Sequence, residues 1–163
     1  MNIIGITGYK HSGKSEAAKY LEIRYGFSRL NFKDALKDFM IETLPDVIAW
    51  CGVHYNMTTD ELFENKPDLF RALMVNIGTD VVRNKFDNDY WVNEWIHGLS
   101  GKLPSSVVAD DTRFLNEERA IRDHGGVIIR IIRPDITTGG SHDSETQQNR
   151  IVSDYTIETV KGD

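Results

Sequence analysis

Short apolar runs alternate with amphipathic segments in the N-terminal part of the chain. Residues 2–7 form an isoleucine-rich run, which is typical of a strand buried within a parallel sheet. Residues 14–25 place alanine, leucine and tyrosine side chains at helical spacing, and this pattern predicts an amphipathic helix. A short strand is predicted over 27–32, and the next helix, over 34–44, ends before Pro45. This order of strand, helix and strand is typical of the start of an α/β fold.

The middle of the chain is less regular. Residues 46–66 show no clear period, so we expect an inserted loop with short helical pieces. Pro67 begins a predicted helix that runs to about Arg83 with its apolar residues on one face. A polar break at 87–89 separates it from a further predicted helix over 90–99. We therefore expect a helical region between the second and third strands.

The C-terminal part returns to alternation. A strand is predicted over 105–109, a helix over 116–123, and a strand over 127–132, the most β-branched run of the chain. A polar segment follows over 134–150, and residues 155–157 predict a last edge strand. Strands that alternate with helices predict an α/β sandwich around a mostly parallel sheet.

Composition and charge narrow the class of protein. The 163 residues suit one domain, and no stretch approaches the roughly 18 uninterrupted apolar residues of a membrane span. The first residues lack the pattern of a signal peptide, and the single cysteine, Cys51, excludes an internal disulfide; both favour a cytoplasmic protein. The net charge of −6, from 25 acidic and 19 basic residues, argues against binding to a nucleic-acid polymer.

Residues 8–15 carry the clearest motif. They match the pattern G-x-x-x-x-G-K-S between the first predicted strand and the first predicted helix, as a phosphate-binding loop requires. Glycines let the backbone turn tightly, so that its N–H groups and the positive end of the helix surround a phosphate. Lys14 can reach the β- and γ-phosphates, and the Ser15 hydroxyl can bind Mg²⁺. The predicted nucleotide contacts are Gly8, Lys10, His11, Ser12, Gly13, Lys14 and Ser15. Lys10 and His11 fill variable positions, where a solvated loop residue is the favoured alternative.

Two acids end the predicted strand over 105–109. Asp110 and Asp111 therefore lie at the carboxyl edge of the sheet, where α/β proteins bind ligands. A carboxylate at this place can hold Mg²⁺ through water near the phosphate loop. The alternative is an aspartate that caps the next helix or begins a turn.

Several arginines are candidates for phosphate recognition, because planar guanidiniums bind phosphate bidentately and compensate charge during its transfer. The candidates are Arg71, Arg83, Arg113, Arg130, Arg133 and Arg150. Arg71 and Arg83 share one face of a predicted helix but lie about 18 Å apart along it. They contact different parts of a substrate unless that helix breaks at Gly78. For each arginine alone, a surface salt bridge is the alternative.

The polar segment over 134–150 lacks the spacing of a core element. Its glycines and polar residues suit a lid that closes over a nucleotide and excludes water, and Arg133 and Arg150 flank it. A passive solvent loop is the alternative. His142 and Glu145 have the spacing of two metal ligands on a helix, but no third ligand is evident, so a cap or a contact within the lid is favoured.

Four blocks of the sequence, taken together, resemble a known family. They are residues 4–15; residues 32–37; residues 78–83 with Tyr90-Trp91-Val92; and Asp111-Thr112-Arg113-Phe114-Leu115-Asn116-Glu117 with the later Gly125-Gly126, Arg133-Pro134 and His142-Asp143-Ser144-Glu145. The first block occurs in many nucleotide-binding proteins, whereas the Asp-x-Arg-Phe-x-Asn-Glu and His-x-Ser-Glu blocks are far more specific. In this order they are similar to the deoxynucleoside monophosphate kinases of tailed bacteriophages, within the P-loop nucleoside monophosphate kinase group.

This resemblance implies a fold and a division of labour. The fold is a three-layer P-loop kinase sandwich with a five-stranded, mostly parallel sheet, in one domain over 1–163. An acceptor-binding helical region corresponds to 46–99, and a lid to 133–150. ATP is the implied phosphoryl donor, together with Mg²⁺, and a homodimer is compatible with the family. Asp111 matches the strand-end aspartate of the family, while Asp110 stands where the family often has a small hydroxyl residue, so the roles of the two acids stay open.

We expect the following roles for the candidate residues. The catalytic residues are Lys14, Asp111, Arg113 and Arg133. The metal ligands are Ser15 and Asp111, and Arg150 adds to the nucleotide contacts. The substrate contacts are Phe32, Lys33, Arg71, Arg83, Trp91 and Arg113. The aromatics that could stack on the acceptor base are Phe32, Trp50, Tyr55 and Trp91, for each of which a place in the core is the alternative.

The function predicted in this way is transfer of the γ-phosphoryl group of ATP to a (deoxy)nucleoside 5′-monophosphate, in the host cytoplasm if the chain is phage-encoded. One alternative is a P-loop kinase for another small phosphorylated acceptor. Phosphomevalonate kinases of animals look similar in the strand-end and His-x-Ser-Glu blocks, and dephospho-coenzyme A kinases in the Phe-x-x-x-Leu-Lys block. A second alternative is a nucleotide-binding module without turnover, against which Ser15, the strand-end acid and the spare arginines argue.

Overall fold

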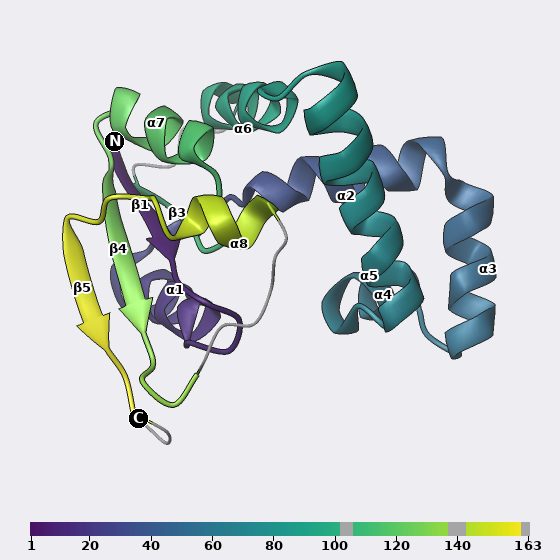
Figure 1. Ribbon diagram of the computed structural model, residues 1–163, viewed down its shortest axis with the longest axis horizontal. Helices are drawn as coiled ribbons and strands as arrows, with labels where there is room; N and C mark the ends of the chain where they lie inside the picture. The colour runs from purple at the N-terminus through teal and green to yellow at the C-terminus, as the bar shows by residue number, and fades with distance from the viewer. Residues whose placement is uncertain (102–105, 137–142, 161–163) are drawn as a thin grey trace. The chain divides into compact units, whose positions relative to one another are not determined.

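The computed structural model describes residues 1–101, 106–136 and 143–160, and the chain divides into two compact units (Figure 1). The first unit consists of Met1–Phe32 and Glu94–Asp163, and the second of Lys33–Asn93. Within the described parts of the chain, no helix is long and apolar enough to cross a membrane.

A five-stranded sheet forms the centre of the first unit. The strands are β1 (Asn2–Thr7), β2 (Ser28–Arg29), β3 (Ser106–Ala109), β4 (Val127–Ile132) and β5 (Tyr155–Glu158). Their order across the sheet is β2-β3-β1-β4-β5, and all four pairings are parallel. The predicted α/β sandwich with a five-stranded parallel sheet is confirmed, although the second strand is shorter than 27–32.

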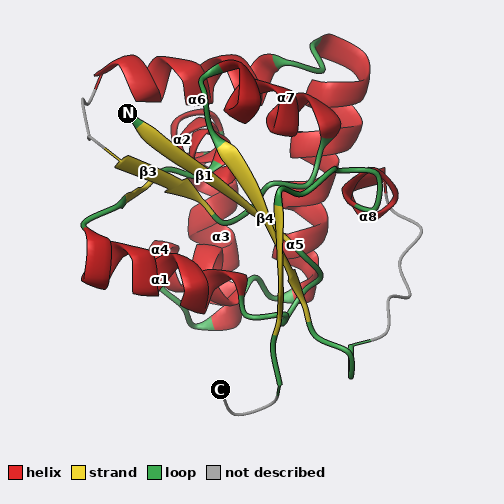
Figure 2. Ribbon diagram, turned by 90° about the vertical axis from the view of Figure 1, so that its left-hand side faces the viewer, coloured by secondary structure: helices red, strands yellow, loops and turns green. Residues whose placement is uncertain are grey.

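Helices cover both faces of this sheet (Figure 2). They include α1 (Lys14–Tyr25), α7 (Leu115–Asp123) and α8 (Asp143–Gln148). Because side chains alternate along a strand, Ile4 and Ile6 of β1 face α1, whereas Ile3 and Gly5 face the side of α7. A Cβ atom at Gly5 would lie 2.5 Å from Cδ1 of Ile121, so this glycine lets α7 approach the sheet closely. Full burial of an isoleucine such as Ile121 contributes about 1.5–3 kcal/mol to folding.

The second unit is helical. The chain enters it through α2 (Phe32–Thr43) and continues through α3 (Pro45–Tyr55), α4 (Thr59–Asn65), α5 (Asp68–Val75), a π-helix η1 (Asn76–Phe86) and the start of α6 (Tyr90–Gly101). Its core consists of the buried residues Met40, Ile48, Cys51, Leu62, Phe63 and Phe70. Burial raises the pKa of the Cys51 thiol, which disfavours a thiolate nucleophile or metal ligand at this position.

Two expectations for this region need correction. The short helical pieces expected over 46–66 are present as α3 and α4, but they fill most of the segment, so it is not an inserted loop. Asn56, in the left-handed conformation at φ 51°, ends α3, and Thr58 begins α4 with a capping box to Glu61. The helix expected from Pro67 to Arg83 stops as an α-helix at Val75 and continues as η1, so the shared helical face expected for Arg71 and Arg83 does not apply.

Candidate nucleotide-binding site

The loop between β1 and α1 has the backbone geometry of a phosphate cradle. Gly8 has φ 145°, and a Cβ atom there would lie 2.3 Å from the carbonyl oxygen of Ile131. Gly13, at φ 101°, leads into α1. Both conformations favour glycine, since they lie in the region that other residues rarely adopt. The two glycines of the motif are therefore required by the shape of the loop.

Lys14 and Ser12 line this loop from within. The Lys14 ammonium, on a buried side chain, donates hydrogen bonds to the carbonyl oxygens of Gly8 at 2.6 Å and Tyr9 at 2.7 Å. The Ser12 hydroxyl is also buried, and it has no hydrogen-bond partner among the described residues. A buried polar atom costs free energy unless it is hydrogen-bonded. A buried cation and a buried hydroxyl in one loop thus fit an anion such as a phosphate.

Residues distant in the sequence hold the outer side of the same loop. Thr159 donates a hydrogen bond to the Ser12 carbonyl oxygen at 3.2 Å, and Arg133 donates to the His11 carbonyl oxygen at 3.2 Å. Arg133 also forms an ion pair with Asp135 at 2.9 Å. Arg133, one of the predicted catalytic residues, therefore lies beside the phosphate loop. Lys10 and His11 are exposed, and His11 has φ 66°.

The two acids after β3 are buried and serve different partners. An Asp111 side-chain oxygen accepts a hydrogen bond from the N–H of Phe32, the first residue of α2, at 3.1 Å. The backbone N–H of Asp110 donates to the side chain of Asn31 at 2.8 Å, and its carboxylate lies 3.7 Å from the Arg29 guanidinium. A capping role for Asp111 is thus observed, but toward α2 and not toward the next helix in sequence.

The residues present fit a magnesium ion by the chemistry of their donor atoms. The Ser15 hydroxyl and the strand-end carboxylates are hard oxygen donors, which Mg²⁺ prefers. Such sites use few protein ligands, because the phosphates and water supply the others. The described residues contain no group of three or more histidine, cysteine or acidic side chains that could hold a metal ion.

Arg113 lies on a turn that a buried carboxylate organises. Glu117 is 2% exposed, and its carboxylate accepts the N–H groups of Arg113 at 2.8 Å and Phe114 at 3.1 Å. The Arg113 side chain is exposed. Glu117 is a residue that the sequence predictions did not single out; its signal was an acid three residues after the helix entry at Phe114.

The remaining predicted residues of the first unit differ in their surroundings. Arg150 is exposed, and its neighbour Asn149 accepts a hydrogen bond from the Tyr9 hydroxyl of the phosphate loop. Phe32 is 3% exposed and stacks on Trp95 with ring centroids 4.7 Å apart, which favours a core role. His142 lies outside the described residues, as do the other residues of 137–142 within the segment predicted as a lid.

The other predicted substrate contacts belong to the second unit. Arg83 is 6% exposed and donates to the Asn88 carbonyl oxygen at 3.3 Å. Trp91 is buried and donates its indole N–H to the Gly78 carbonyl oxygen at 2.8 Å, which again favours a core role. Lys33 and Arg71 are half-buried.

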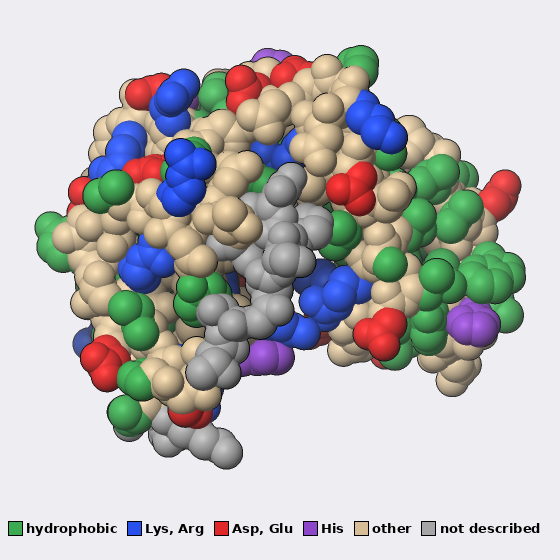
Figure 3. All heavy atoms as spheres, viewed as in Figure 1, with side chains coloured by type: hydrophobic (Ala, Val, Ile, Leu, Met, Phe, Trp, Pro, Cys, Tyr) green, Lys and Arg blue, Asp and Glu red, His purple; other side chains and the backbone are tan. Residues whose placement is uncertain are grey.

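The two remaining aromatic candidates, Trp50 and Tyr55, lie on α3. Trp50 is exposed and stacks on His54, with ring centroids 5.0 Å apart, whereas Tyr55 packs against the core of the second unit. On the face drawn in Figure 3, lysine and arginine side chains occupy several separate places among acidic ones.

A glycine-rich loop between a parallel strand and a helix, with acids at the end of the neighbouring strand, defines a P-loop nucleotide-binding protein. A family model described as deoxynucleotide monophosphate kinase matches residues 49–159. A protein of Acanthamoeba polyphaga mimivirus that carries the same kinase name is 34% identical over 167 residues, which cover 94% of this chain and 85% of that protein. The chain therefore belongs to the deoxynucleotide monophosphate kinase family, and it is a kinase.

A further relative agrees with this assignment, and a solved structure shares the fold. The deoxynucleotide monophosphate kinase of Enterobacteria phage T4 is 33% identical over 124 residues. That match covers 73% of this chain and 51% of the phage enzyme, so the chain spans about half the length of this relative. A crystal structure from Thermus thermophilus aligns over 98% of this chain and 89% of its own, at 18% identity and a TM-score of 0.51, which shows a shared fold. The resemblance inferred from the four sequence blocks is confirmed.

Proposed function

We propose that this protein transfers the γ-phosphoryl group of ATP to the phosphate of a deoxynucleoside 5′-monophosphate, giving ADP and the diphosphate. The observation that carries this proposal is the phosphate loop of a family member, with the Lys14 ammonium held at its carbonyl oxygens. The acceptor phosphate attacks in line, and the protein contributes positioning and charge compensation, with no covalent intermediate of its own.

Donor binding is assigned to the phosphate loop. Lys14 and the backbone N–H groups of residues 10–15 would hold the donor phosphates. Ser15 and Asp111 would hold Mg²⁺, which supplies neutralisation of phosphate charge when bound. Since Asp111 also accepts the N–H of Phe32, the same carboxylate would connect the donor site with the first turn of α2. Arg133, already bonded to the His11 carbonyl oxygen, would add positive charge beside the loop, and Arg150 would add further charge.

Acceptor binding is assigned to the cations that the sequence predicts for it. Arg113, on its turn after β3, would compensate charge on the transferred group. Lys33, Arg71 and Arg83 would bind the acceptor phosphate. Phe32 and Trp91 are buried, which supports a structural role in place of the base stacking that the sequence suggested. Each would hold the backbone near the proposed acceptor-binding cations. A homodimer and action in the host cytoplasm stay predictions, the first testable by light scattering of the purified protein.

The proposal is tested by coupled ADP release with a panel of acceptors. The panel consists of the four common deoxynucleoside monophosphates, their ribose forms, phosphomevalonate and dephospho-coenzyme A. We expect at least one deoxynucleotide to stimulate ADP release strongly and the two non-nucleotide acceptors to leave it at the background. Stimulation by phosphomevalonate or dephospho-coenzyme A alone would overturn the proposal in favour of another kinase. Nucleotide binding without release for any acceptor would assign a non-catalytic module.

A further inference from the structure

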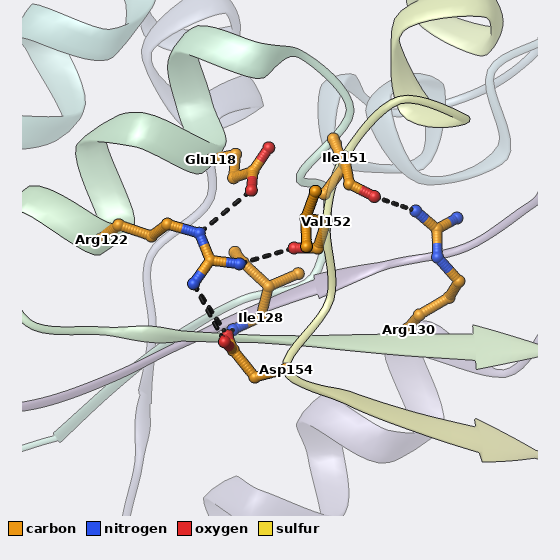
Figure 4. Close-up of polar contacts among 7 residues, drawn as sticks. All are labelled: Glu118, Arg122, Ile128, Arg130, Ile151, Val152 and Asp154. Atoms are coloured by element: carbon orange, nitrogen blue, oxygen red, sulfur yellow. Dashed lines mark hydrogen bonds and ion pairs between the residues drawn. The ribbon is translucent and has the colours of Figure 1, made fainter.

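Two arginines of the first unit form hydrogen bonds with the connection between α8 and β5 (Figure 4). Arg122 of α7 donates to the Asp154 carboxylate at 3.0 Å and to the Val152 carbonyl oxygen at 2.6 Å. Arg130 of β4 donates to the carbonyl oxygens of Gln148 at 3.2 Å and Ile151 at 2.7 Å. The same short connection is therefore held at two different points by guanidiniums from two different elements.

The contacts of Arg130 define a tight turn. Within it, the N–H of Arg150 donates to the Gln147 carbonyl oxygen at 2.9 Å, and Gln148 and Ile151 are each 4% exposed. A guanidinium presents several donors in a fixed planar fork, which suits two carbonyl oxygens on either side of a turn. This use of Arg130 differs from the phosphate contact that the sequence suggested, because its donors meet backbone oxygens.

This turn reaches the phosphate loop. Its exposed residue Asn149 accepts a hydrogen bond from the Tyr9 hydroxyl, and Tyr9 is the loop residue whose carbonyl oxygen also receives the Lys14 ammonium. The backbone of Arg130 pairs with Thr7, the last residue of β1 before the loop. A continuous series of contacts thus runs from Arg130 through the turn and Asn149 to Tyr9 and the catalytic lysine.

We propose that Arg130 is a positioning residue of the donor site: it fixes the turn at 148–151 so that Asn149 holds Tyr9 and keeps the phosphate loop in its binding geometry. The inference rests on the proposed function in that the loop binds the donor nucleotide. Arg122 offers a matched control, because it holds residues 152–154 and no contact of the described structure joins it to the turn.

The test measures ADP affinity by titration calorimetry and the unfolding temperature for four variants. Arg130→Met keeps the alkyl stem and removes the donors, and Asn149→Ala and Tyr9→Phe each break the last contact without touching Arg130. We expect each of the three to weaken ADP binding about fivefold to tenfold, as the loss of one or two hydrogen bonds implies. Arg122→Met should lower the unfolding temperature and leave ADP affinity unchanged.

A double variant distinguishes positioning from a general loss of stability. Arg130→Met combined with Tyr9→Phe should bind ADP no more weakly than the weaker single variant, because both changes break one series of contacts. Unchanged ADP affinity in Asn149→Ala and Tyr9→Phe, multiplicative losses in the double variant, or an equal loss in Arg122→Met would each overturn the inference. ADP binding needs no acceptor, so a wild-type protein that binds ADP but phosphorylates no deoxynucleotide would contradict the proposed function alone.

Discussion

The two units of the molecule present their positive charge in different ways. In the first unit, the phosphate loop collects Lys14 and its backbone N–H groups within eight consecutive residues, and glycine geometry sets their direction. In the second unit, Lys33, Arg71 and Arg83 come from different helices, and Arg83 is buried with a backbone partner of its own. Under the proposed function, this difference predicts that donor binding depends on local chain geometry, whereas acceptor binding depends on how the helices of the second unit pack.

The largest effect is expected in the phosphate loop. Lys14→Ala removes the buried ammonium that would contact the donor phosphates, and we expect turnover to fall at least about 100-fold, as for other groups that stabilise transferred charge. Coupled ADP release measures this loss. Lys10→Ala is the matched control. It removes an exposed lysine of the same loop, and we expect the rate to change less than about threefold. Similar losses in both variants would show that the loop depends on net charge and not on one placed ammonium.

A second variant addresses the acceptor side. Arg83→Met should raise the KM for the deoxynucleotide about tenfold, since a charge-assisted hydrogen bond contributes roughly 1.5–3 kcal/mol. ADP affinity should stay at the wild-type value, because Arg83 is not among the residues proposed to bind the donor. Arg83→Lys keeps the charge and should recover part of the loss. If Arg83→Met lowers only the unfolding temperature, Arg83 supports the fold through Asn88 and does not bind the acceptor.

A smaller effect on turnover is expected from a substitution in the turn that carries Arg113. Glu117→Ala leaves the N–H groups of Arg113 and Phe114 without their acceptor, and we expect kcat to fall about tenfold as the turn loosens, because a lost hydrogen bond costs about 1–2 kcal/mol. Glu117→Gln retains one acceptor oxygen and should recover most of the rate. Steady-state kinetics at saturating ATP measure both. A folded Glu117→Ala protein with the wild-type kcat would show that Arg113 needs no such support.

One buried tryptophan in each unit allows a direct comparison of stability. Trp95→Phe removes the hydrogen bond to the Leu30 carbonyl oxygen, 2.9 Å long, and Trp91→Phe removes its counterpart to Gly78. Each variant should lose about 1–3 kcal/mol of unfolding free energy, since each removes the hydrogen bond of a buried indole together with part of its ring. Urea unfolding followed by circular dichroism measures the losses. A loss of unfolding free energy in only one variant would mean that the indole hydrogen bond stabilises one unit and not the other.

The smallest effect concerns acid stability. The N–H of Ile128 and the guanidinium of Arg122 hold the pKa of Asp154 below its ordinary value. A carboxyl whose folded pKa is lowered stabilises the protein above its unfolded pKa of about 3.9, and this contribution is lost as the pH falls through the folded value. The difference in unfolding free energy between wild type and Asp154→Asn should therefore shrink from about pH 6 to pH 3. A difference that is constant with pH would exclude a charged Asp154 as its source.

Several elements could be predicted from the sequence because their signal is local. The isoleucine-rich residues 2–7 and 127–132 became β1 and β4, since strands of a parallel sheet covered by helices are rich in β-branched apolar residues. Helix α1 begins and ends as predicted, with Gly26 in the left-handed conformation after its last residue. For α3 and α4 only short helical pieces were predicted, without their bounds, because short helices gain their stability from packing around Leu62 and its neighbours more than from their own period.

The sequence by itself determined the phosphate loop of this kinase. The conformations at Gly8 and Gly13 are properties of those residues, and the adjoining strand and helix follow from local patterns. Only the tertiary structure decided which side chains support that loop. Asp111 meets an N–H group 79 positions away, and Arg130 meets carbonyl oxygens 18 and 21 positions away. A hydrogen bond between such distant residues depends on how the sheet and turns are assembled, and no local pattern of residues encodes it.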